Sequence, residues 1–512
     1  MVISRQARIP FRGRFARGRF SVPAVMVEQL ELRSPANPSD VIAVFGCGED
    51  DVPETVASAV DAQAAWQRLG ADARGDVLLR IELSLRPQLA ELAIRMQREL
   101  GRPAWECERE LGGLVPRLRD VVELARCELD DRKLHAGTRL QRRPLGVVAV
   151  LGPVMFPLAT SHAAIVAALM AGNTVVWKPS PLVAASAQLY AEALSAAGLP
   201  AGVFNLVQGG AQVGERLVLH PQVNGVVFAG SADNARALRR LSADRLELKT
   251  ILHSGAKNSA LVLDDADVDP TVSELVHGAF ATAGQRPSAI GRVLVQANVL
   301  EPFLELLVHA CRRLVVDGGG TTRKASFGPM FSKERVDRFQ ARLAAAEADG
   351  ARVVLRSEAR GCLVRPSIHV VEDPRHAVAY RTEELFGPDL VVEPVTDVAE
   401  ALERLRGHGG LYASCFTQSH KSWRAFSAGV QSGALLWNHS PMSVSARIPL
   451  AAAGRESARG LQALLALTRE AAVCDASTAP ALPFVVAEEP LVEPRRLAPP
   501  RIVSARKAEV RR

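Results

Sequence analysis

Residues 146–178 read GVVAVLGPVMFPLATSHAAIVAALMAGNTVVWK, and this stretch sets the architecture of the chain. Gly146–Leu151 and Thr174–Trp177 are short runs rich in valine, which is typical of buried β-strands. The segment Ala163–Met170 between them has the length and apolar character of a buried helix. A strand–helix–strand unit of this kind predicts a parallel sheet covered by helices.

The same alternation continues outward from this stretch. Strands are predicted at Val203–Val207 and Gly225–Phe228, and a second series starts at Ser259 and runs to about Trp437. Before residue 146, the residues from Pro53 to Asp130 have helical periodicity. We therefore predict an α/β fold with two doubly wound domains, whose ligands bind beyond the carboxyl ends of the strands.

Composition supports a large globular protein. The chain has 512 residues, of which 48% are hydrophobic and 23% are charged, enough for two or three domains. No apolar run reaches the 18 or so residues of a membrane-spanning helix. The seven cysteines are scattered singly, without the spacing of a metal site, so we expect a reducing, cytoplasmic location and no metal. Cys311 and Cys415 lie in apolar patterns and are expected in the core.

The net charge of +7 comes from the two ends of the chain. The first 20 residues hold six arginines and no acidic residue, and residues 490–512 hold seven basic residues against two acidic ones. The body between them is mildly acidic, which argues against nucleic acid as a partner. Residues 1–20 and 489–512 are read as solvated extensions, and the second is rich in proline. Leu482–Val486 is the one strand predicted near that end.

The turns after the predicted strands carry a distinctive series of motifs. In chain order they are Gly152–Pro157, Lys178–Ser180, Phe228–Ser231, Gly255–Asn258, Gly284–Arg286, Glu383–Pro388 and Trp437-Asn438. In order and spacing this series resembles the aldehyde dehydrogenase superfamily over about residues 20–475. Within it, the chain is most similar to the succinylglutamate-semialdehyde dehydrogenases.

The resemblance implies a division of the chain. Residues 21–132 and 147–252 would form a dinucleotide-binding domain, and residues 253–437 a catalytic-type domain. Residues 133–146 and 461–488 would form a small oligomerisation element of a dimer or tetramer, with a hairpin near Lys133–Arg143 and its partner strand after Leu461.

The catalytic positions implied by the resemblance are all altered. Members oxidise an aldehyde through a thioester on the Cys after Gly-Gln-Arg, where this chain has Pro287. The Asn that donates a hydrogen bond to the oxyanion is replaced by Met155, whose thioether has no proton to donate. The Glu that acts as general base is replaced by His253. Proline also lacks the backbone N–H that serves as a second oxyanion donor in the family.

The cofactor positions implied by the resemblance are better kept. They are Lys178, Ser180, Gly230, Ser231, Glu384 and Phe386. Pro181 and Ala235 depart from the family pattern, where many members have a glutamate and a glycine. The sequence therefore predicts that NAD or NADP binds weakly or not at all.

These replacements favour a catalytically inactive member, a pseudoenzyme acting as a structural or regulatory subunit, for example in a homo-oligomer or with an active paralogue. Two alternatives stay open. One is active NAD(P)-dependent oxidation of a semialdehyde similar to succinylglutamate semialdehyde, with a nucleophile from elsewhere. The other is a binding module that works through the basic ends of the chain.

Overall fold

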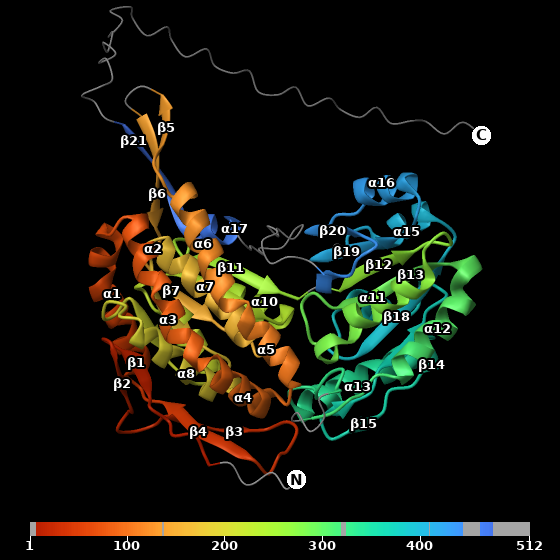
Figure 1. Cartoon of the computed structure of the whole chain (residues 1–512), viewed down its shortest axis with the longest axis horizontal. Coiled ribbons are helices and arrows are strands. Elements are labelled where there is room, and N and C mark those ends of the chain that lie inside the picture. The colour runs from red at the N-terminus through yellow and green to blue at the C-terminus, as the bar shows by residue number, and fades with distance from the viewer. Residues whose placement is uncertain are drawn as a thin grey trace, which may run out of the picture.

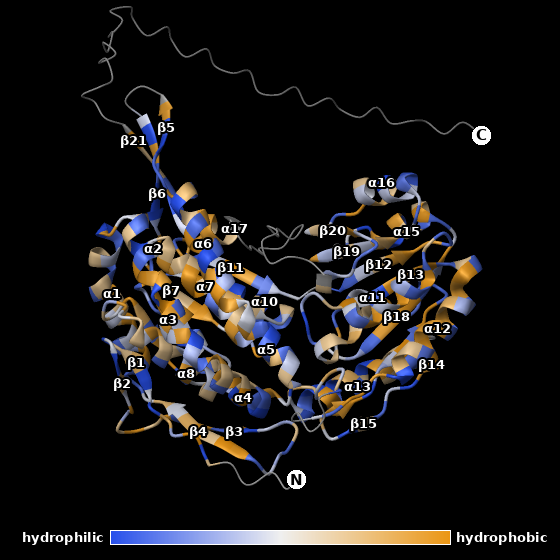
Figure 2. Ribbon diagram, in the orientation of Figure 1, coloured by the Kyte–Doolittle hydropathy of each residue, from blue (hydrophilic) through white to orange (hydrophobic). Residues whose placement is uncertain are grey.

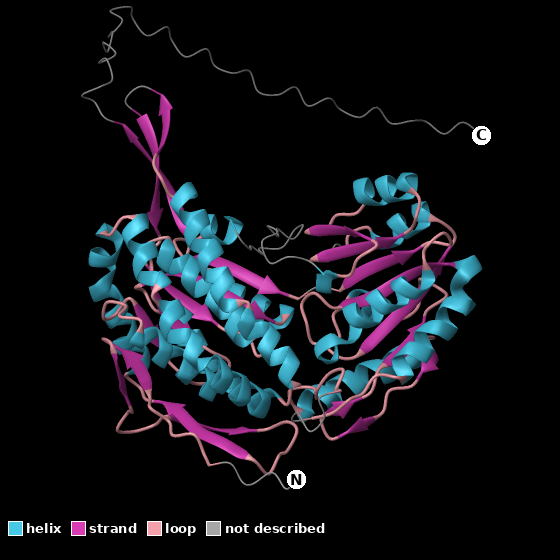
Figure 3. Cartoon of the chain, viewed as in Figure 1, coloured by secondary structure: helices cyan, strands magenta, loops and turns pink. Residues whose placement is uncertain are grey.

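A computed structural model describes residues 7–135, 138–255, 257–318, 324–408, 410–443 and 461–474. Two lobes are each built around a seven-stranded β-sheet, and a three-stranded arm projects from the first lobe (Figure 1). Helices lie against both sheets (Figure 3). The predicted α/β class is therefore confirmed.

The first sheet has the strand order β11-β10-β7-β8-β9-β1-β2. Its parallel strands are β7 (Val147–Leu151), β8 (Thr174–Lys178), β9 (Phe204–Leu206), β10 (Val223–Gly230) and β11 (Lys249–Ser254). The chain runs from β7 outward to β9 and then returns to the other side of β7 for β10. In a parallel sheet, such a reversal of strand order opens a crevice at the carboxyl ends of the strands. The turns after β7 and β10 meet at this point.

The strands predicted in this sheet are present, with ends shifted by one or two residues, and β11 is an additional strand. His253 lies in β11 and so belongs to the first sheet, although the sequence analysis placed it at the start of the second domain. The run Thr250–Leu252 is too short to have predicted a strand by its pattern.

The N-terminal segment joins the first sheet. β1 (Arg14–Ala16) and β2 (Arg19–Ser21) form a hairpin that pairs antiparallel with β9. Phe15 is 4% exposed, and Arg14 forms ion pairs with two carboxylates of the following helix. The expectation that residues 1–20 are a solvated extension is therefore wrong from Arg14 onward. Burial of an aromatic side chain outweighs the basic composition there.

Helices cover both faces of the first sheet. Val148 and Val150 of β7 belong to one hydrophobic cluster, which includes residues of α2–α8, whereas Val147 and Ala149 belong to another with α1, α9 and α10. Both faces of the strand are buried, which explains its unbroken apolar run. The helices are α1 (Asp51–Arg68), α2 (Ala71–Leu79), α3 (Ile81–Leu85), α4 (Leu89–Leu100), α5 (Ala104–Gly112), α6 (Leu114–Glu128), α7 (Pro157–Met170), α8 (Ala184–Ala196), α9 (Ala211–Leu219) and α10 (Ala232–Leu241).

The second sheet has the order β14-β17-β18-β13-β12-β19-β20 and is parallel except for β14. Its strands are β12 (Asn258–Val262), β13 (Ile290–Gln296), β14 (Arg352–Leu355), β17 (Ser367–Val370), β18 (Asp389–Val395), β19 (Tyr412–Phe416) and β20 (Ala434–Trp437). Its helices are α11 (Val268–Phe280), α12 (Leu300–Arg312), α13 (Lys333–Ala348), α14 (Val378–Thr382), α15 (Val398–Leu405) and α16 (His420–Gly429). Strands of both sheets are mostly hydrophobic in Figure 2.

Cys311 and Cys415 are both 0% exposed, and each belongs to a hydrophobic cluster of this second lobe. The prediction that both cysteines lie in the core is therefore confirmed.

The projecting arm joins two distant segments of the chain. β5 (Arg132–His135), β6 (Thr138–Pro144) and β21 (Thr468–Cys474) form an antiparallel sheet in the order β21-β6-β5. Thr468 pairs with Pro144, and α17 (Leu461–Ala466) contacts α6 and α7 before β21. A hairpin thus forms where one was expected. The predicted strand Leu482–Val486 and the tail 489–512 lie outside the described residues.

The smaller elements complete the chain. They are the hairpins β3 (Glu28–Arg33)–β4 (Val41–Cys47) and β15 (Ala359–Arg360)–β16 (Leu363–Val364), with short 3₁₀ turns at Arg86–Gln88, Pro181–Val183, Ala281–Gly284, Ala297–Val299 and Pro441–Ser443.

Candidate dinucleotide-binding cleft

A cleft of about 1390 Å³ lies between the two lobes, at the carboxyl ends of the strands of the first sheet. It is lined by all nine site residues named from the sequence: Met155, Lys178, Ser180, Gly230, Ser231, His253, Pro287, Glu384 and Phe386. The structure therefore brings the predicted site together from turns that are up to 231 residues apart in the sequence.

The turn between β10 and α10 is suited to an anionic group. Ser231 is the N-cap of α10, and its Oγ accepts a hydrogen bond from the Asn234 amide at 3.3 Å. The amino end of a helix carries partial positive charge and favours anions. A side chain at Gly230 would overlap the Phe228 ring, so the close turn needs glycine there.

Lys178 ends β8, and Ser180 follows it on the same side of the cleft. Lys178 is 8% exposed, and its Nζ donates to the Pro179 carbonyl at 3.0 Å. Burial lowers the pKa of Lys178 to about 8, against the opposing effect of Glu28. Ser180 Oγ accepts from the Leu182 amide at 3.3 Å and starts the next turn. Lys178 therefore places a buried amino group, which can donate hydrogen bonds, at this wall of the cleft.

The loop with Glu384 and Phe386 enters the cleft from the second lobe. The Phe386 ring meets the Phe331 ring edge-on, with centroids 6.2 Å apart, and Phe386 has a φ of 57°. The Glu384 carbonyl accepts from Arg342 Nη1 at 3.1 Å. The Glu384 carboxylate lies against Gly255, where any Cβ would overlap it. A strained, well-held loop of this kind is characteristic of ligand sites.

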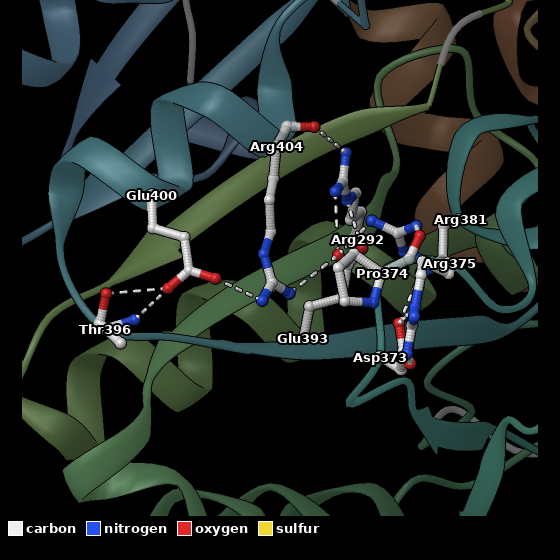
Figure 4. Close-up of polar contacts among 9 residues, drawn as sticks. All are labelled: Arg292, Asp373, Pro374, Arg375, Arg381, Glu393, Thr396, Glu400 and Arg404. Carbon is white, nitrogen blue, oxygen red and sulfur yellow. Dashed lines mark hydrogen bonds and ion pairs between the residues drawn. The ribbon is translucent and has the colours of Figure 1, made fainter.

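A buried ion-pair network supports this loop from behind (Figure 4). Arg381, in α14 just before the loop, donates to the Glu393 carboxylate at 2.7 Å, and Arg292 of β13 donates to the same carboxylate at 2.9 Å. Burial raises the pKa of Glu393, but the two guanidinium groups outweigh it, so the pKa lies below its ordinary value. No sequence signal pointed to this network, because Arg292 and Glu393 lie 101 residues apart.

A second set of contacts fixes the middle of α14. Lys257 Nζ donates to the Tyr380 carbonyl at 2.6 Å, and the Tyr380 hydroxyl donates to Asp389 at 2.6 Å. The loop 383–388 is therefore held in place on both sides, by Tyr380 before it and Asp389 after it.

The inner wall of the cleft, the part around Met155 and Pro287, has few groups that could attack a carbonyl carbon or bind its oxygen. Met155 is 5% exposed, and Pro287 contributes a ring and a carbonyl that accepts from Asn258 Nδ2 at 2.8 Å. Neither side chain has a proton to donate or a nucleophilic atom of use in acyl transfer. Ser288 also lines this cleft.

The cysteines are placed mainly in the core. Of the six whose side chains are described, five are buried, and burial raises the pKa of Cys47, Cys107, Cys311 and Cys415 to about 12. Cys127, in the last turn of α6, is exposed and lines the cleft. The sequence analysis gave Cys127 no role, because it belongs to no motif. The five buried thiols, unlike that of Cys127, are expected to be unreactive.

The inner wall is held by α5, which lies within the predicted helical region 53–130 but was given no part in the site. Glu106 Oε1 accepts from the Thr282 amide at 2.9 Å, and Glu110 Oε1 accepts from the Leu158 amide at 3.1 Å. Arg102 donates to both carboxylates, at 3.0 and 2.6 Å. Thr282 has a φ of 59°, outside the usual range for its type. Glu106 and Glu110, one helical turn apart on α5 with Arg102 just before the helix, were a usable signal for such a network.

The architecture and the cleft define a known class of protein. The chain belongs to the aldehyde dehydrogenase family, whose model matches residues 22–460. It is 33% identical over 432 residues to an N-succinylglutamate 5-semialdehyde dehydrogenase of Burkholderia pseudomallei, covering 83% of this chain and 88% of that one.

Solved structures agree in fold. The lactaldehyde dehydrogenase of Escherichia coli superposes with a TM-score of 0.85 at 26% identity, covering 90% of this chain and 98% of that one. An NADP-dependent glyceraldehyde-3-phosphate dehydrogenase of Bacillus halodurans, solved in complex with NADP, superposes with a TM-score of 0.83 at 26% identity, covering 90% and 99% of the two chains.

None of the described helices is long and apolar enough to cross a bilayer, and the same residues contain no group of three or more His, Cys, Asp or Glu side chains arranged to hold a metal ion.

Proposed function

We propose that this chain binds NAD or NADP weakly in its cleft but does not oxidise aldehydes through a covalent thioester. It would then be a non-catalytic member of its family. The observation that carries this proposal is the inner wall, where Pro287 and Met155 line the cleft. His253, at the end of β11, takes the place that the resemblance assigns to the base.

Covalent aldehyde oxidation needs a thiolate, donors for the oxyanion, a base and a hydride acceptor. Pro287 supplies neither a nucleophile nor a backbone N–H. Loss of a covalent nucleophile costs about 10⁶ in rate, and loss of one oxyanion donor roughly 10² to 10³. The nucleophile alone is therefore decisive.

The residues that would bind the dinucleotide lie on the other wall of the cleft, opposite Met155 and Pro287. Gly230 and Ser231 would receive the phosphates, Lys178 and Ser180 the adenosine ribose, and Glu384 with Phe386 the nicotinamide half. The turn before α10 fits a phosphate, because its glycine leaves no side chain in the way and its helix end favours anions. When bound, the dinucleotide supplies a hydride acceptor.

We further propose a structural or regulatory role within an oligomer, either of identical chains, as a dimer or tetramer, or with an active paralogue. The three-stranded arm supports this role, because its central strand β6 has no fully buried residue, and a small sheet needs a hydrophobic face or a packed neighbour to be stable.

A second candidate function is active oxidation of a semialdehyde. It is favoured by the relatives at 33% identity named N-succinylglutamate 5-semialdehyde dehydrogenase. It requires a nucleophile other than residue 287. Ser288 and the exposed Cys127 are the hydroxyl and thiol in the cleft to test first.

The two candidates are separated by assay of the purified full chain. We expect saturable NADH binding by fluorescence titration, together with a turnover of succinylglutamate semialdehyde near 10⁻⁵ s⁻¹, about 10⁶ below a typical 10 s⁻¹. Ordinary dehydrogenase turnover would establish the second candidate. Absence of NADH binding up to about millimolar would instead remove the cofactor from the proposal.

A restored thiol tests the position of Pro287. In Pro287→Cys, we expect iodoacetamide to label the new cysteine faster than the native ones, most of which are buried. Ser288→Cys is the matched control, one residue out of register. Equal labelling of the two variants would contradict the assignment of residue 287 to the position of the family's reactive cysteine. Labelling of Pro287→Cys no faster than that of the unchanged chain would contradict it too.

A further inference from the structure

His369 of β17 is a buried histidine that contacts the residue directly after the cleft loop 383–388. It is 1% exposed. Its Nδ1 lies 2.9 Å from Asp389 Oδ1, and its Nε2 lies 3.5 Å from Glu347 Oε1 on α13. The Asp389 side chain is fully buried, whereas that of Glu347 is 27% exposed. Both ring nitrogens of His369 therefore face a carboxylate.

Only the protonated ring satisfies both contacts. An imidazolium ring carries an N–H on each nitrogen, whereas a neutral imidazole has one N–H and one lone pair. If the N–H of the neutral ring points to Asp389, its lone pair faces the Glu347 carboxylate, which is repulsive. Burial lowers the pKa of His369, but the two carboxylates outweigh it, so the pKa lies above its ordinary value of 6.5.

Asp389 is the centre of these contacts. Its carboxylate accepts from the Ser367 hydroxyl at 2.8 Å and from the Tyr380 hydroxyl at 2.6 Å. Burial raises the pKa of Tyr380 well above its ordinary value, and Asp389 adds to the increase, so this hydroxyl stays a donor. Lys257 of β12 is a nearby cation, and burial lowers the pKa of Lys257 to about 8. Asp389 is thus a buried anion that depends on its donors.

The other charges around His369 have partners of their own. Glu347 shares its carboxylate with Arg356, at 3.1 Å. Glu393 of β18 is bound by the arginine pair described above. Arg352 of the neighbouring strand β14 pairs with two glutamates outside this cluster. Ion-paired glutamates and arginines keep their charge near neutral pH.

The helix α13 is tied to both ends of the cleft loop. Arg342 of α13 donates to the Glu384 carbonyl at 3.1 Å, near the start of the loop. Glu347, farther along the same helix, is joined through His369 to Asp389, directly after the loop. The protonated ring thus fixes the end of the loop relative to the helix that holds its start.

We propose that protonated His369 is a positioning residue that holds the cleft loop 383–388, and that the loop loosens when His369 loses its proton. Because the pKa is raised in the folded chain, the contacts are complete below pH 6.5 and are lost as the pH rises through the raised pKa. This inference concerns the loop in the free chain and does not rest on the proposed function.

Hydrogen exchange of the full chain, followed by mass spectrometry on peptides that cover the loop, tests the inference without a ligand. Protection factors, corrected for the intrinsic exchange rate, are compared at about pH 6 and about pH 9. We expect protection of the loop to fall about tenfold across this range, as for a lost hydrogen bond to a charged group. Protection of β7 in the first lobe should stay unchanged.

Two variants and a control assign the effect to His369. His369→Asn keeps an amide donor for Asp389 but cannot carry a charge, so its loop should have the lower protection at both pH values. Glu347→Gln alters a partly exposed side chain and should also lose most of the pH dependence, which keeps the test valid if the first variant misfolds. His376→Asn is the matched control, because His376 is 53% exposed, and it should retain the tenfold fall.

Three outcomes would overturn the inference. One is equal protection of the loop at the two pH values in the unchanged chain. Another is a fall that persists undiminished in His369→Asn and Glu347→Gln, which would assign the pH dependence to Lys257. The third is a loss of protection spread evenly over the second lobe, which would mean that His369 stabilises that lobe as a whole. NADH binding is a separate measurement, so none of these outcomes alters the dinucleotide proposal.

Discussion

Gly255 shows how one missing side chain shapes the cleft. It follows β11, and the Glu384 carboxylate of the other lobe lies where its Cβ would be. The overlap involves the far end of a flexible side chain and no backbone. An added methyl group would therefore move Glu384 without preventing folding.

For Gly255→Ala, we expect NADH to bind about tenfold more weakly, equivalent to ~1.4 kcal/mol, with little change in unfolding temperature. Fluorescence titration measures the affinity. Gly112→Ala is the control, because no heavy atom lies within 4 Å of its added Cβ. An affinity equal to that of the unchanged chain would show that Glu384 takes no part in dinucleotide binding.

Among the secondary-structure elements, the N-terminal hairpin departs most from expectation. Composition marks residues 1–20 as a charged extension, yet β1 and β2 extend the first sheet beyond β9. The Phe15 ring lies 6.2 Å from the Phe204 ring of β9. One buried aromatic side chain can attach a short segment that has few apolar residues of its own.

Phe15→Ala should reduce the free energy of unfolding by about 3–5 kcal/mol, the usual cost of removing a buried aromatic ring. Urea denaturation followed by fluorescence provides the measurement. Val25→Ala is the comparison, since Val25 is 74% exposed. A Phe15→Ala change as small as that of Val25→Ala would mean that the hairpin is not part of the cooperative fold.

In the whole molecule, α5 joins the two lobes around the inner wall of the cleft. Glu106 accepts hydrogen bonds from Thr282 of the second lobe, and the indole of Trp105 donates to the Ala325 carbonyl at 2.9 Å. Arg102, just before α5, pairs with Glu106. A buried carboxylate therefore links the lobes at the point where the candidate ligands would bind.

Glu106→Ala should lower the free energy of unfolding by about 3–5 kcal/mol, because it breaks a buried ion pair and leaves Arg102 with one carboxylate fewer. Denaturant unfolding measures this change in stability. Glu108→Ala is the matched control on the exposed face of the same helix and should stay within about 0.5 kcal/mol. Similar stability of the two variants would refute the bridging role.

Much of the site was predictable, because it lies in turns after strands. Apolar runs with turn residues at their ends mark the strands of a doubly wound sheet, and their carboxyl ends meet at one edge. Met155, Lys178, Ser231 and Glu384 were named together because the motifs in these turns resemble those of the family. Arg286 was quoted only as part of a motif, because its unpaired charge depends on where Glu106 and Glu110 direct their oxygens.

The sequence by itself determined the α/β class, the family and the chemical identity of residue 287, because apolar periodicity and residue type are local properties of the chain. The tertiary structure alone decided which charges are paired. Arg292 and Glu393 meet across 101 residues, whereas Arg286 forms no ion pair with a carboxylate among the described residues, although Glu106 and Glu110 lie nearby. Pairing of charges depends on distances of a few ångströms between distant segments, and only folding sets those distances.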